Sequence, residues 1–590
     1  MFNQLTPPLP GPTNTFSPLA TSAIFEEAVE VAGNEAFLIH LLERQQSLSA
    51  VEAFSIEIDS GVRPSQASHY TKLMPTTVPT VGQQYAFEVD LDRCSGCKAC
   101  VAACHSLNGL DPVESWRDVG LLIGGTTTLP VMQHVSSACH HCIEPACMHA
   151  CPVNAYEKDL MTGIVRHLDD QCFGCQYCTL ACPYGVPKYH AQKGIVRKCD
   201  MCSHRLADGE APACVQACPH EAISIRIVDR QQVIEDAEAD PFLPAAPDPQ
   251  ITLPTTRYKT NRVFPRNMLP VDYYQVNPQH PHWPLIIMLV LTQMSIGAFI
   301  VNLLFDQFID QSLLSAFRKL HATIALFFGL IALGASTLHL GRPQYAFRAI
   351  LGLRHSWLSR EIVAFGLFAN AAVCFAVACW LIPNSQIIVV LAWTVAITGM
   401  IGVFCSTMIY VFTKREFWSF GRTIAKFSLT SAILGIAATW LTILVYGLFI
   451  DESGAELVLR TAGRTLTLSL IVTTASKLGL ELWFLTALLS RQNTPLKRTA
   501  RLLVGPLSSS LLARIALGIL GGIVMPLFVI PPFDLPDFAS QVSATNALTN
   551  NQQVISVGML FLACFAGEVI ERYHFFAACA SARMPGRLGG

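Results

Sequence analysis

The sequence predicts two folds in series: an α+β domain organised around cysteines, followed by an all-α membrane bundle of about eight transmembrane helices. Three observations predict this fold class. The chain has 590 residues, which exceeds one ordinary domain of roughly 100 to 200 residues. Of its 21 cysteines, 16 lie between residues 94 and 218. From residue 283 onward the composition changes to long apolar runs.

The overall composition supports the membrane part. The chain is 52% hydrophobic and 14% charged, with a mean hydropathy of +0.41. Soluble domains usually contain about 25% charged residues. The 40 Lys and Arg residues nearly balance the 42 Asp and Glu residues, so the net charge is -2. Nucleic-acid binding needs a basic surface, so nucleic acid is not expected as a partner, whereas a lipid bilayer is.

The chain divides into four predicted segments. Residues 1–84 form an N-terminal extension of unassigned function, with a Pro-rich start and an amphipathic helix around residues 36–54. Residues 85–232 hold the cysteine domain, residues 233–282 a Pro- and Asp-rich linker, and residues 283–590 the membrane bundle. No charged segment followed by an apolar run opens the sequence, so we expect no secretory signal and an N-terminal half that begins in the cytoplasm.

The cysteine domain repeats one motif four times, with three cysteines and a fourth that follows after three further residues; the three are close together except in the last group, where eleven residues separate Cys202 from Cys214. The four groups are Cys94, Cys97, Cys100 and Cys104; Cys139, Cys142, Cys147 and Cys151; Cys172, Cys175, Cys178 and Cys182; and Cys199, Cys202, Cys214 and Cys218. In ferredoxins, a compact loop brings three sulfurs to one cluster, and the fourth cysteine binds the neighbouring cluster. Sixteen thiolates therefore allow four [4Fe-4S] clusters, in a ferredoxin-like polycluster domain of the α+β class.

Zinc sites and disulfides are the competing interpretations of these cysteines. Zinc sites usually pair C-x2-C units, and disulfides need an oxidising compartment. Cys151, Cys182 and Cys218 are each followed by proline, as in bacterial ferredoxins. Thiolates cap every iron of such a cluster, so no position stays open for a substrate. We therefore expect the domain to transfer electrons and to be non-catalytic alone.

These motifs resemble the iron–sulfur subunit of dimethyl sulfoxide reductase and related molybdoenzymes, over residues 85 to about 228. The matching segments are YAFEVD at 85–90, RCSGCKAC at 93–100, CHHCIEPAC at 139–147 and CFGCQYCTLACPYGVP at 172–187. The resemblance implies four ligand sets: Cys94, Cys97, Cys100 and Cys218; Cys199, Cys202, Cys214 and Cys104; Cys139, Cys142, Cys147 and Cys182; and Cys172, Cys175, Cys178 and Cys151. It also implies that the cluster of the third group lies nearest the quinone, with Tyr177 beside it. His105 departs from the pattern, because a proline often follows the fourth cysteine.

Eight apolar windows follow, each long enough for a helix to cross a hydrocarbon core of roughly 30 Å. The windows are residues 284–305, 320–340, 361–382, 387–412, 428–450, 465–489, 511–531 and 553–575. They show almost no polar face with a period of 3.6 residues, which the helices of a soluble core would need. We therefore predict eight spans.

The Lys and Arg residues of the loops predict the orientation. Fourteen fall on the side that carries both chain ends, namely Arg342, Arg348, Arg354, Arg360, Lys414, Arg415, Arg422, Lys426, Arg491, Lys497, Arg498, Arg501, Arg583 and Arg587. Four fall on the other side, namely Arg318, Lys319, Arg460 and Arg464. By the positive-inside rule, the protein is expected to be a multi-pass protein of the inner membrane, with the cysteine domain on the cytoplasmic side.

Two ionisable residues near the ends of the windows are candidates for function, because such residues are costly in a membrane. His339 ends the second window and Glu361 opens the third. A quinol that loses two electrons also releases two protons, so a histidine and a carboxylate near its hydroxyls suit its chemistry. The alternative is structural, with His339 capping a helix and Glu361 pairing with Arg360.

The remaining charges in the windows are expected to be structural. Lys477 and Glu481 are four residues apart and would neutralise each other, and Glu568 would pair with Arg572 at a helix end. Haem b would need paired histidines on facing spans. The interior of the spans offers almost none, so no haem is expected.

The second half resembles the membrane anchor subunit of dimethyl sulfoxide reductase, over residues 275 to about 585. The matching segments are HPHWPLII at 280–287, LHLGRP at 338–343, LSREI at 358–362 and GEVIER at 567–572. In that family the positions of His339 and Glu361 serve quinol binding, so the resemblance favours a site for menaquinone or ubiquinone. It also implies a separate molybdenum bis-pterin catalytic subunit as a partner.

Together, the two halves predict the electron-transfer and membrane-anchor subunit of a respiratory molybdoenzyme complex, with dimethyl sulfoxide reductase as the nearest resemblance. A cytoplasmic sulfite dehydrogenase that delivers electrons to quinone is one alternative, since its subunits are similar and it suits the predicted topology. A structural anchor whose clusters relay electrons without quinone chemistry is the other.

Overall fold

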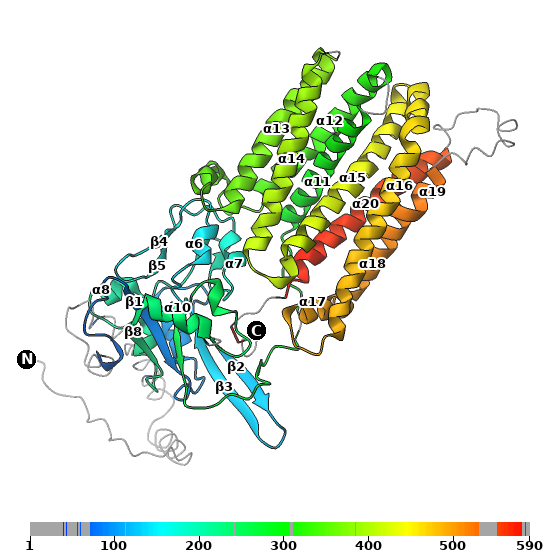
Figure 1. The fold of residues 1–590 in the computed structure, drawn as a ribbon. Helices are drawn as coiled ribbons and strands as arrows, with labels where there is room; N and C mark the ends of the chain where they lie inside the picture. The colour runs from blue at the N-terminus through cyan, green and yellow to red at the C-terminus, as the bar shows by residue number, and fades with distance from the viewer. Residues whose placement is uncertain are drawn as a thin grey trace, which may run out of the picture. The chain divides into compact units, whose positions relative to one another are not determined.

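The computed structural model describes residues 71–580, apart from residues 113, 240–241, 276, 307–310, 384 and 530–550, together with positions 39, 43, 56, 60, 584 and 585. The chain forms two compact units, Met1–Lys72 and Leu73–Gly590. The cysteine domain and the long apolar helices both belong to the second unit (Figure 1). The amphipathic helix predicted around residues 36–54 lies almost entirely outside the described residues.

The cysteine domain is built from short strands and short helices. Its strands are β1 (Gln83–Asp90), β2 (Asp118–Gly125), β3 (Pro130–Ser137), β4 (Tyr156–Lys158), β5 (Val165–His167), β6 (Lys188–His190), β7 (Ile195–Arg197), β8 (Ile223–Asp229), β9 (Arg257–Lys259) and β10 (Leu269–Pro270). Its helices are η1 (Thr71–Leu73), α5 (Ala99–Leu107), α6 (Ala146–Ala150), α7 (Tyr177–Ala181), α8 (Ser203–Ala207), α9 (Ala213–Gln216), α10 (Arg230–Ala239) and η2 (Pro249–Ile251).

The short helices repeat in step with the cysteine motif. Each of α5, α6, α7 and α9 begins one residue before the third cysteine of its group. The helix carries the fourth cysteine of the group away from the loop that holds the other three. Helix α5 packs against α9, and α6 packs against α7. Groups one and four therefore lie together, and so do groups two and three.

Strand pairing closes the cysteine domain. β1 pairs antiparallel with β8, from Gln83 opposite Asp229 to Val89 opposite Ile223, so its first and last long strands are neighbours. β1 also pairs in parallel with β9, and β10 pairs antiparallel with β2 of the β2–β3 hairpin. β4 with β5 and β6 with β7 form two further hairpins.

Parts of residues 233–282, predicted as a linker, contribute strands to the cysteine domain. β9 and β10 complete the two three-stranded sheets. Thr252, Thr255 and Thr256 are buried, and the Thr256 hydroxyl lies 2.9 Å from Nδ1 of His140. Strands of two or three residues carry no measurable periodicity, so composition alone could not reveal them. The cysteine domain extends through β10.

The second half is helical. Its elements are α11 (Trp283–Phe305), α12 (Gln311–Thr337), η3 (Pro343–Gly352), α13 (Trp357–Leu381), α14 (Ile387–Phe412), η4 (Glu416–Trp418), α15 (Phe420–Phe449), α16 (Glu452–Phe484), η5 (Leu485–Leu489), α17 (Pro495–Val504), α18 (Ser508–Ile519), the π-helical turn η6 (Leu520–Val524), α19 (Met525–Val529) and α20 (Asn551–Ala577). Among the described residues, eight helices are long and apolar enough to cross a membrane, which confirms the predicted number.

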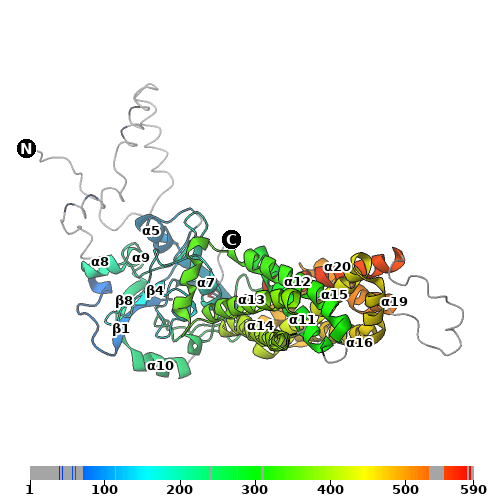
Figure 2. The ribbon, with the colours of Figure 1, turned by 90° about the horizontal axis from the view of Figure 1, so that it is seen from above.

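Helices α11 and α15 form the centre of the bundle. Of their apolar windows, 78% and 72% are buried, more than in any other candidate span. Gly297 of α11 and Gly435 of α15 face each other so closely that a Cβ on either would clash with the opposite backbone. Small residues allow such close packing of membrane helices. Figure 2 shows α13 and α14 on one side of this centre and α16 and α19 on the other.

Candidate metal centres and membrane site

Three cavities in the cysteine domain are each lined by four cysteines. The Cys94 cavity is lined by Cys94, Cys97, Cys100 and Cys218; the Cys139 cavity by Cys139, Cys142, Cys147 and Cys182; and the Cys172 cavity by Cys151, Cys172, Cys175 and Cys178. The remaining four, Cys104, Cys199, Cys202 and Cys214, interact with one another and form a fourth group, the Cys199 set. The structure thus brings together the members of each of the four sets named from the sequence.

Left-handed backbone shapes the loops of groups one and three. Gly96 and Gly174 follow the first cysteine of their groups by two residues, with φ of 77° and 74°. Lys98 and Gln176, directly before α5 and α7, have φ of 63° and 60°. Glycine adopts this conformation without steric cost, whereas a Cβ introduces strain. At Gly174 a Cβ would also clash with the carbonyl oxygen of Gly194.

Polar side chains beside the cavities could donate hydrogen bonds to a bound group that is rich in sulfur. Nε2 of His140 and Nε2 of His141 are buried beside the Cys139 cavity, and neither has a hydrogen-bond partner among the described residues. The Val165 N–H donates to Nδ1 of His141 at 3.0 Å, so Nε2 of His141 carries the proton. In the Cys172 cavity, the Tyr156 hydroxyl lies beside Cys178. Buried donors need acceptors, and the sulfurs of an iron–sulfur cluster accept such hydrogen bonds. The residues present therefore fit such a cluster.

The thiols themselves favour a bound cationic centre. Burial raises the pKa of Cys104 to about 12, and its neighbour Cys214 adds to the shift. Ionised thiolates repel one another in a buried site unless a cation shares their charge. A metal binds thiolates and not thiols, so metal binding is what would keep the four sulfurs ionised together.

Two buried cations lie among the cysteine sets. Arg117, which is 2% exposed, donates to the Ser136 hydroxyl at 3.0 Å and lies near Cys214. Lys198, which is 3% exposed, donates to the Cys199 carbonyl at 2.7 Å. Burial disfavours both charges, but the neighbouring thiolates outweigh it and raise the pKa of Lys198 and of Arg117. Sequence reasoning missed both residues, and the only available signal was the position of Lys198 directly before a cysteine.

The Cys172 cavity lies against the membrane helices. In the loop after α12, the N–H groups of Gly341 and Arg342 donate to the carbonyls of Gly174 and Phe173 at 3.4 and 3.0 Å. Gly341 and Gly194 approach so closely that a Cβ on either would clash with the other's backbone. The loop of the third cysteine group is therefore bound to the end of a membrane helix.

The start of α13 adds a second contact between the two parts. The Ser356 hydroxyl donates to the Ala150 carbonyl at 2.7 Å, and Nε2 of His355 lies 3.0 Å from the Cys151 carbonyl oxygen. Cys151 belongs to the Cys172 cavity. The backbone around this cavity is thus held by both ends of the α12–α13 connection.

The structure places Tyr177 beside Glu361. Tyr177 is 3% exposed, and its hydroxyl donates to the Ile409 carbonyl of α14 at 2.9 Å. Glu361, the fifth residue of α13, is 4% exposed, with Ser406 of α14 beside it. Burial raises the pKa of Tyr177, and the nearby Glu361 and Cys175 add to the shift. Tyr177 therefore lies between the Cys172 cavity and a buried carboxylate.

The pairing of Glu361 with Arg360, considered from the sequence, does not occur. Arg360 donates to the carbonyls of Leu353 and Arg354 at 3.1 and 2.8 Å, and its guanidinium lies 4.3 Å from the centre of the Trp357 ring. Within the described part of the chain Glu361 forms no ion pair. Ser406 is the neighbour that meets its carboxylate.

His339 lies in the turn that follows α12 and is half-buried. Burial lowers its pKa to about 4, and the nearby His282 contributes. The ring is therefore neutral at pH 7, and a neutral ring nitrogen can accept a hydrogen bond. In the described structure no hydrogen bond or ion pair joins His339 to Glu361, so the two residues are not brought into direct contact.

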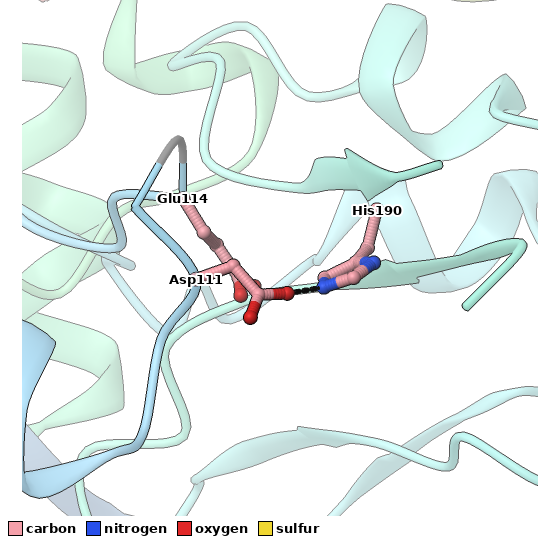
Figure 3. Close-up of side chains that lie close together, drawn as sticks. All are labelled: Asp111, Glu114 and His190. Atoms are coloured by element: carbon pink, nitrogen blue, oxygen red, sulfur yellow. Dashed lines mark hydrogen bonds and ion pairs between the residues drawn. The ribbon is translucent and has the colours of Figure 1, made fainter. Parts of the chain in front are cut away.

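A separate cluster of Asp111, Glu114 and His190 resembles a metal site but is satisfied by the protein (Figure 3). The Lys193 N–H donates to Nδ1 of His190, so Nε2 carries the proton that meets the Asp111 carboxylate. Glu114 accepts from Nε1 of Trp116 and from the Arg197 guanidinium, each at 2.8 Å. The cluster fixes the segment after α5 against the β6–β7 hairpin.

The predicted neutral pair of Lys477 and Glu481 is wrong. The Lys477 ammonium contacts Glu568 of α20, and Glu481 pairs with Arg514 of α18 at 3.0 Å. Lys477 and Glu568 are 91 residues apart, so spacing along the sequence carries no signal for this pair. Contacts between packed helices replace the local pairing that the i, i+4 spacing suggests.

Two known protein families match consecutive parts of the chain. A family described as a 4Fe-4S dicluster domain matches residues 130–228. A family described as the DMSO reductase anchor subunit (DmsC) matches residues 276–482. The first match covers β3 to β8 of the cysteine domain, and the second covers α11 to α15 and most of α16.

Individual relatives are similar over most of their own length. The probable anaerobic dimethyl sulfoxide reductase subunit YnfG of Escherichia coli strain K12 is 40% identical over 148 residues, which are 24% of this chain and 72% of the relative. The B subunit of anaerobic dimethyl sulfoxide reductase from Haemophilus influenzae is 34% identical over 189 residues, which are 30% of this chain and 91% of the relative. The B subunit from Escherichia coli strain K12 is 39% identical over 154 residues, which are 25% and 75%.

Proposed function

Because this protein belongs to the dimethyl sulfoxide reductase family and joins an iron–sulfur subunit to a membrane anchor subunit, we propose that it relays electrons between membrane quinone and a separate catalytic subunit. The observation that carries this proposal is the place of Tyr177, between Cys175 of the third cysteine group and Glu361 of the membrane bundle. An electron path and a proton-binding side chain meet at this point.

We assign a [4Fe-4S] cluster to each of the Cys94, Cys139 and Cys172 cavities and a fourth to the Cys199 set. The grouping of four cysteines at each place supports this assignment, as do the unpartnered Nε2 atoms of His140 and His141. Bound clusters supply one-electron transfer. Arg117 and Lys198 offset the negative charge of the thiolates around them.

We place the quinone near Tyr177, Glu361 and His339. Oxidation of a quinol yields two electrons and two protons. Glu361 has no cation partner among the described residues, so its carboxylate can accept a proton, and His339 is neutral at pH 7, so its ring can accept a hydrogen bond from a quinol hydroxyl. Tyr177 and the backbone contacts of Gly341 hold the Cys172 cavity next to this site. Menaquinone and ubiquinone both satisfy this chemistry, and no haem is needed.

The partner is a molybdenum bis-pterin catalytic subunit, as the resemblance to dimethyl sulfoxide reductase suggests. Of the sixteen cysteines in the four sets, all within the described residues, Cys97 is exposed and the others are buried or half-buried. The Cys94 cavity is therefore the place where electrons can pass to a docked protein. The dicluster family and the relatives that are B subunits support a relay role and not catalysis by this protein alone.

The basic loops support a cytoplasmic position for the cysteine domain, in an inner-membrane protein. Arg415, between α14 and α15, donates to the Leu180 carbonyl at 3.1 Å, and Arg342 donates to the Asp169 carbonyl at 3.0 Å. The loops rich in Lys and Arg thus contact the cysteine domain. This orientation favours a second candidate function, a cytoplasmic sulfite dehydrogenase that delivers electrons to quinone.

Membranes with and without this protein distinguish the two functions. Sulfite-driven reduction of quinone and quinol-driven reduction of dimethyl sulfoxide are measured side by side. Activity with dimethyl sulfoxide that depends on the protein supports the reductase, and activity with sulfite that depends on it supports the dehydrogenase. Activity that is independent of the protein in both measurements contradicts a relay role in either reaction.

A further inference from the structure

The β4–β5 hairpin presents a histidine to the Cys172 cavity. His167 ends β5 and lines this cavity together with Tyr156 of β4. The two residues are paired across the strands, and their rings meet edge to face with 4.9 Å between the centres. The His167 side chain is 4% exposed. The hairpin therefore holds the imidazole ring inside the protein, against one wall of the cavity.

One nitrogen of this ring is held by a carboxylate. Nδ1 of His167 lies 2.8 Å from the Asp169 carboxylate. An ionised carboxylate only accepts hydrogen bonds, so Nδ1 donates to it. The backbone behind the carboxylate is fixed by the connection between α12 and α13, where Arg342 donates to the Asp169 carbonyl at 3.0 Å and Arg348 donates to the Asp170 carbonyl at 3.1 Å. The direction of the ring is thus set from both the hairpin and the membrane part.

The other nitrogen of the ring has no acceptor in the protein. Nε2 of His167 is buried and forms no hydrogen bond within the described part of the chain. With Nδ1 turned to Asp169, Nε2 is the nitrogen that faces Cys172. A buried polar nitrogen that stays unpaired is costly, so its position indicates an acceptor bound in the cavity.

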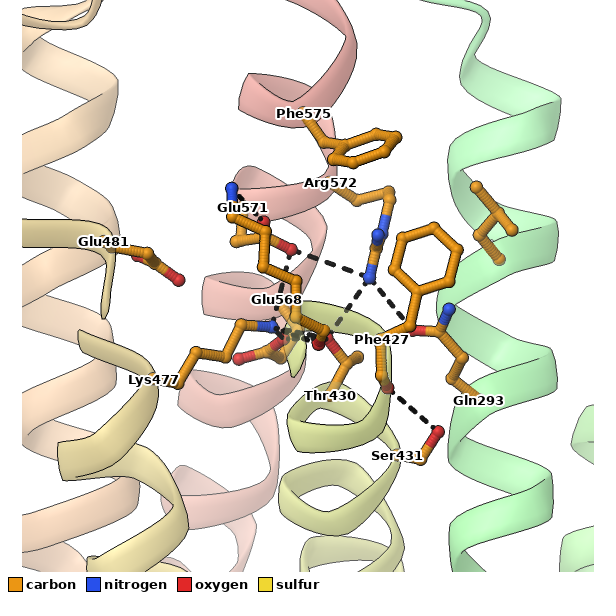
Figure 4. Close-up of polar contacts among 12 residues, drawn as sticks. Gln293, Phe427, Thr430, Ser431, Lys477, Glu481, Glu568, Glu571, Arg572 and Phe575 are labelled. Atoms are coloured by element: carbon orange, nitrogen blue, oxygen red, sulfur yellow. Dashed lines mark hydrogen bonds and ion pairs between the residues drawn. The ribbon is translucent and has the colours of Figure 1, made fainter. Parts of the chain in front are cut away.

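The charged side chains buried in the membrane bundle, by contrast, meet partners in the protein (Figure 4). The Lys477 ammonium contacts the Glu568 carboxylate. The pair of Glu568 with Arg572 expected from the sequence is replaced by Arg572 with Glu571, at 3.6 Å. The burial of these charges needs no bound ligand, whereas the burial of Nε2 of His167 does.

His167 also distinguishes one cysteine of the cavity from the other three. Burial disfavours a charged ring, but the contacts with Asp169 and Cys172 outweigh it and raise the pKa of His167. Burial disfavours the Cys172 thiolate as well, yet the contact with His167 outweighs it and lowers the pKa of Cys172. Burial raises the pKa of the other three thiols, which belong to Cys151, Cys175 and Cys178.

We propose that Nε2–H of His167 donates a hydrogen bond to the Cys172 sulfur when this cysteine binds its [4Fe-4S] cluster, and that the bond raises the reduction potential of that cluster. With an acceptor on each side, the ring donates from both nitrogens, as a charged histidine does. Hydrogen bonds to the sulfurs and the charge around a cluster set its potential. A donor favours the reduced state, because that state carries the more negative charge.

This proposal rests on the proposed function, because it needs a cluster in the Cys172 cavity. It adds to that function a reason for electrons to enter at this place. The Cys172 cavity adjoins Tyr177 and Glu361, so its cluster would be the first to take electrons from a quinol. A higher potential at this cluster favours that transfer.

His167→Val tests the potential, because valine suits a strand and carries no donor. The full chain is purified in nanodiscs with its clusters bound, and a redox titration is followed by electron paramagnetic resonance. At the potential where the native cluster is half reduced, we expect the ratio of reduced to oxidised cluster to fall by about 10-fold in His167→Val, in line with the strength of a hydrogen bond to a charged group. The other three clusters should keep their potentials. His167→Gln, whose amide can donate to the same sulfur, should recover part of the loss.

Arg166→Gln is the matched control. Arg166 precedes His167 in β5, so its side chain points to the opposite face of the hairpin. There it is 43% exposed and pairs with Glu157 at 3.1 Å. Loss of this solvated charge should leave all four potentials near their native values. Equal potentials in the native chain and in His167→Val, at full iron content, would overturn the proposal and leave the proposed function standing.

Pulsed electron paramagnetic resonance tests the hydrogen bond itself. The chain is labelled with ¹⁵N-histidine, and the coupling of ring nitrogens to the reduced clusters is measured. We expect the native chain and Arg166→Gln to show a coupled nitrogen that His167→Val lacks. Identical spectra from all three chains would overturn the hydrogen bond. A native chain that binds no cluster in the Cys172 cavity would contradict the proposed function as well, so the two failures are distinguishable.

Discussion

At the scale of single residues, two buried cations next to the cysteine sets can tune the reduction potentials of the proposed clusters. Lys198 lies beside Cys199 and near Cys139, and Arg117 lies near Cys214. Net charge and hydrogen bonds around a cluster set its reduction potential. Such cations stabilise the reduced state, because it carries the more negative charge.

Lys198→Met is expected to lower the reduction potential of a neighbouring cluster by on the order of 100 mV, since a charge roughly 6 Å away is worth about 3 kcal/mol at an effective dielectric constant of about 20. A redox titration followed by electron paramagnetic resonance measures the shift. Lys259→Met is the matched control, because Lys259 is exposed and its charge is screened by solvent. Equal potentials in the native chain and in Lys198→Met, at full cluster content, would contradict the role of Lys198.

The pH dependence of quinol oxidation tests His339. Burial lowers its pKa to about 4, so the ring stays neutral from pH 8 to pH 6 and gains a proton only as the pH falls toward 4. We expect the rate of quinol oxidation by the native chain, divided by the rate of His339→Gln, to be constant from about pH 8 to pH 6 and to fall near pH 4. A ratio that falls with a midpoint near pH 6.5, the usual value for histidine, would show a solvated ring and contradict the buried site.

At the scale of elements, three glycines decide how the cysteine domain meets the membrane helices. Gly174, Gly194 and Gly341 bring the loop of the third cysteine group and the end of α12 into backbone contact. The segment LHLGRP at 338–343 indicated a quinone site from the sequence. The need for Gly341 could not be seen there, because its partner Gly194 lies far away in the chain.

Gly341→Ala is expected to separate these loops, at a cost of roughly 1–3 kcal/mol for overpacking. Electron flow between quinone and clusters should fall, while the iron content per chain stays the same. Gly334→Ala, in the last turns of α12, is the control, because a Cβ there meets no atom within 4 Å. Unchanged electron flow in Gly341→Ala would show that this contact does not set the distance to the quinone.

At the scale of the whole molecule, the patterns that repeat along the chain were the predictable ones. Cysteine spacing and apolar windows both act locally, so the four cysteine groups and the eight spans could be found from the sequence. The short strands β9 and β10 and the contact of Lys477 with Glu568 depend on distant partners, and the sequence carries no local sign of them. The place of Tyr177 beside Glu361 joins the two halves in the same long-range way.

The central claim is that quinone exchanges electrons with the clusters beside Glu361. The most direct measurement reduces the clusters of the purified chain in nanodiscs with dithionite, adds a quinone analogue, and follows cluster oxidation by rapid-mixing spectroscopy. Glu361→Gln keeps the size of the side chain and removes its charge. We expect fast oxidation in the native chain and oxidation slower by about 10- to 100-fold in Glu361→Gln at equal cluster content. Oxidation at the same rate in both chains would contradict a quinone site at Glu361.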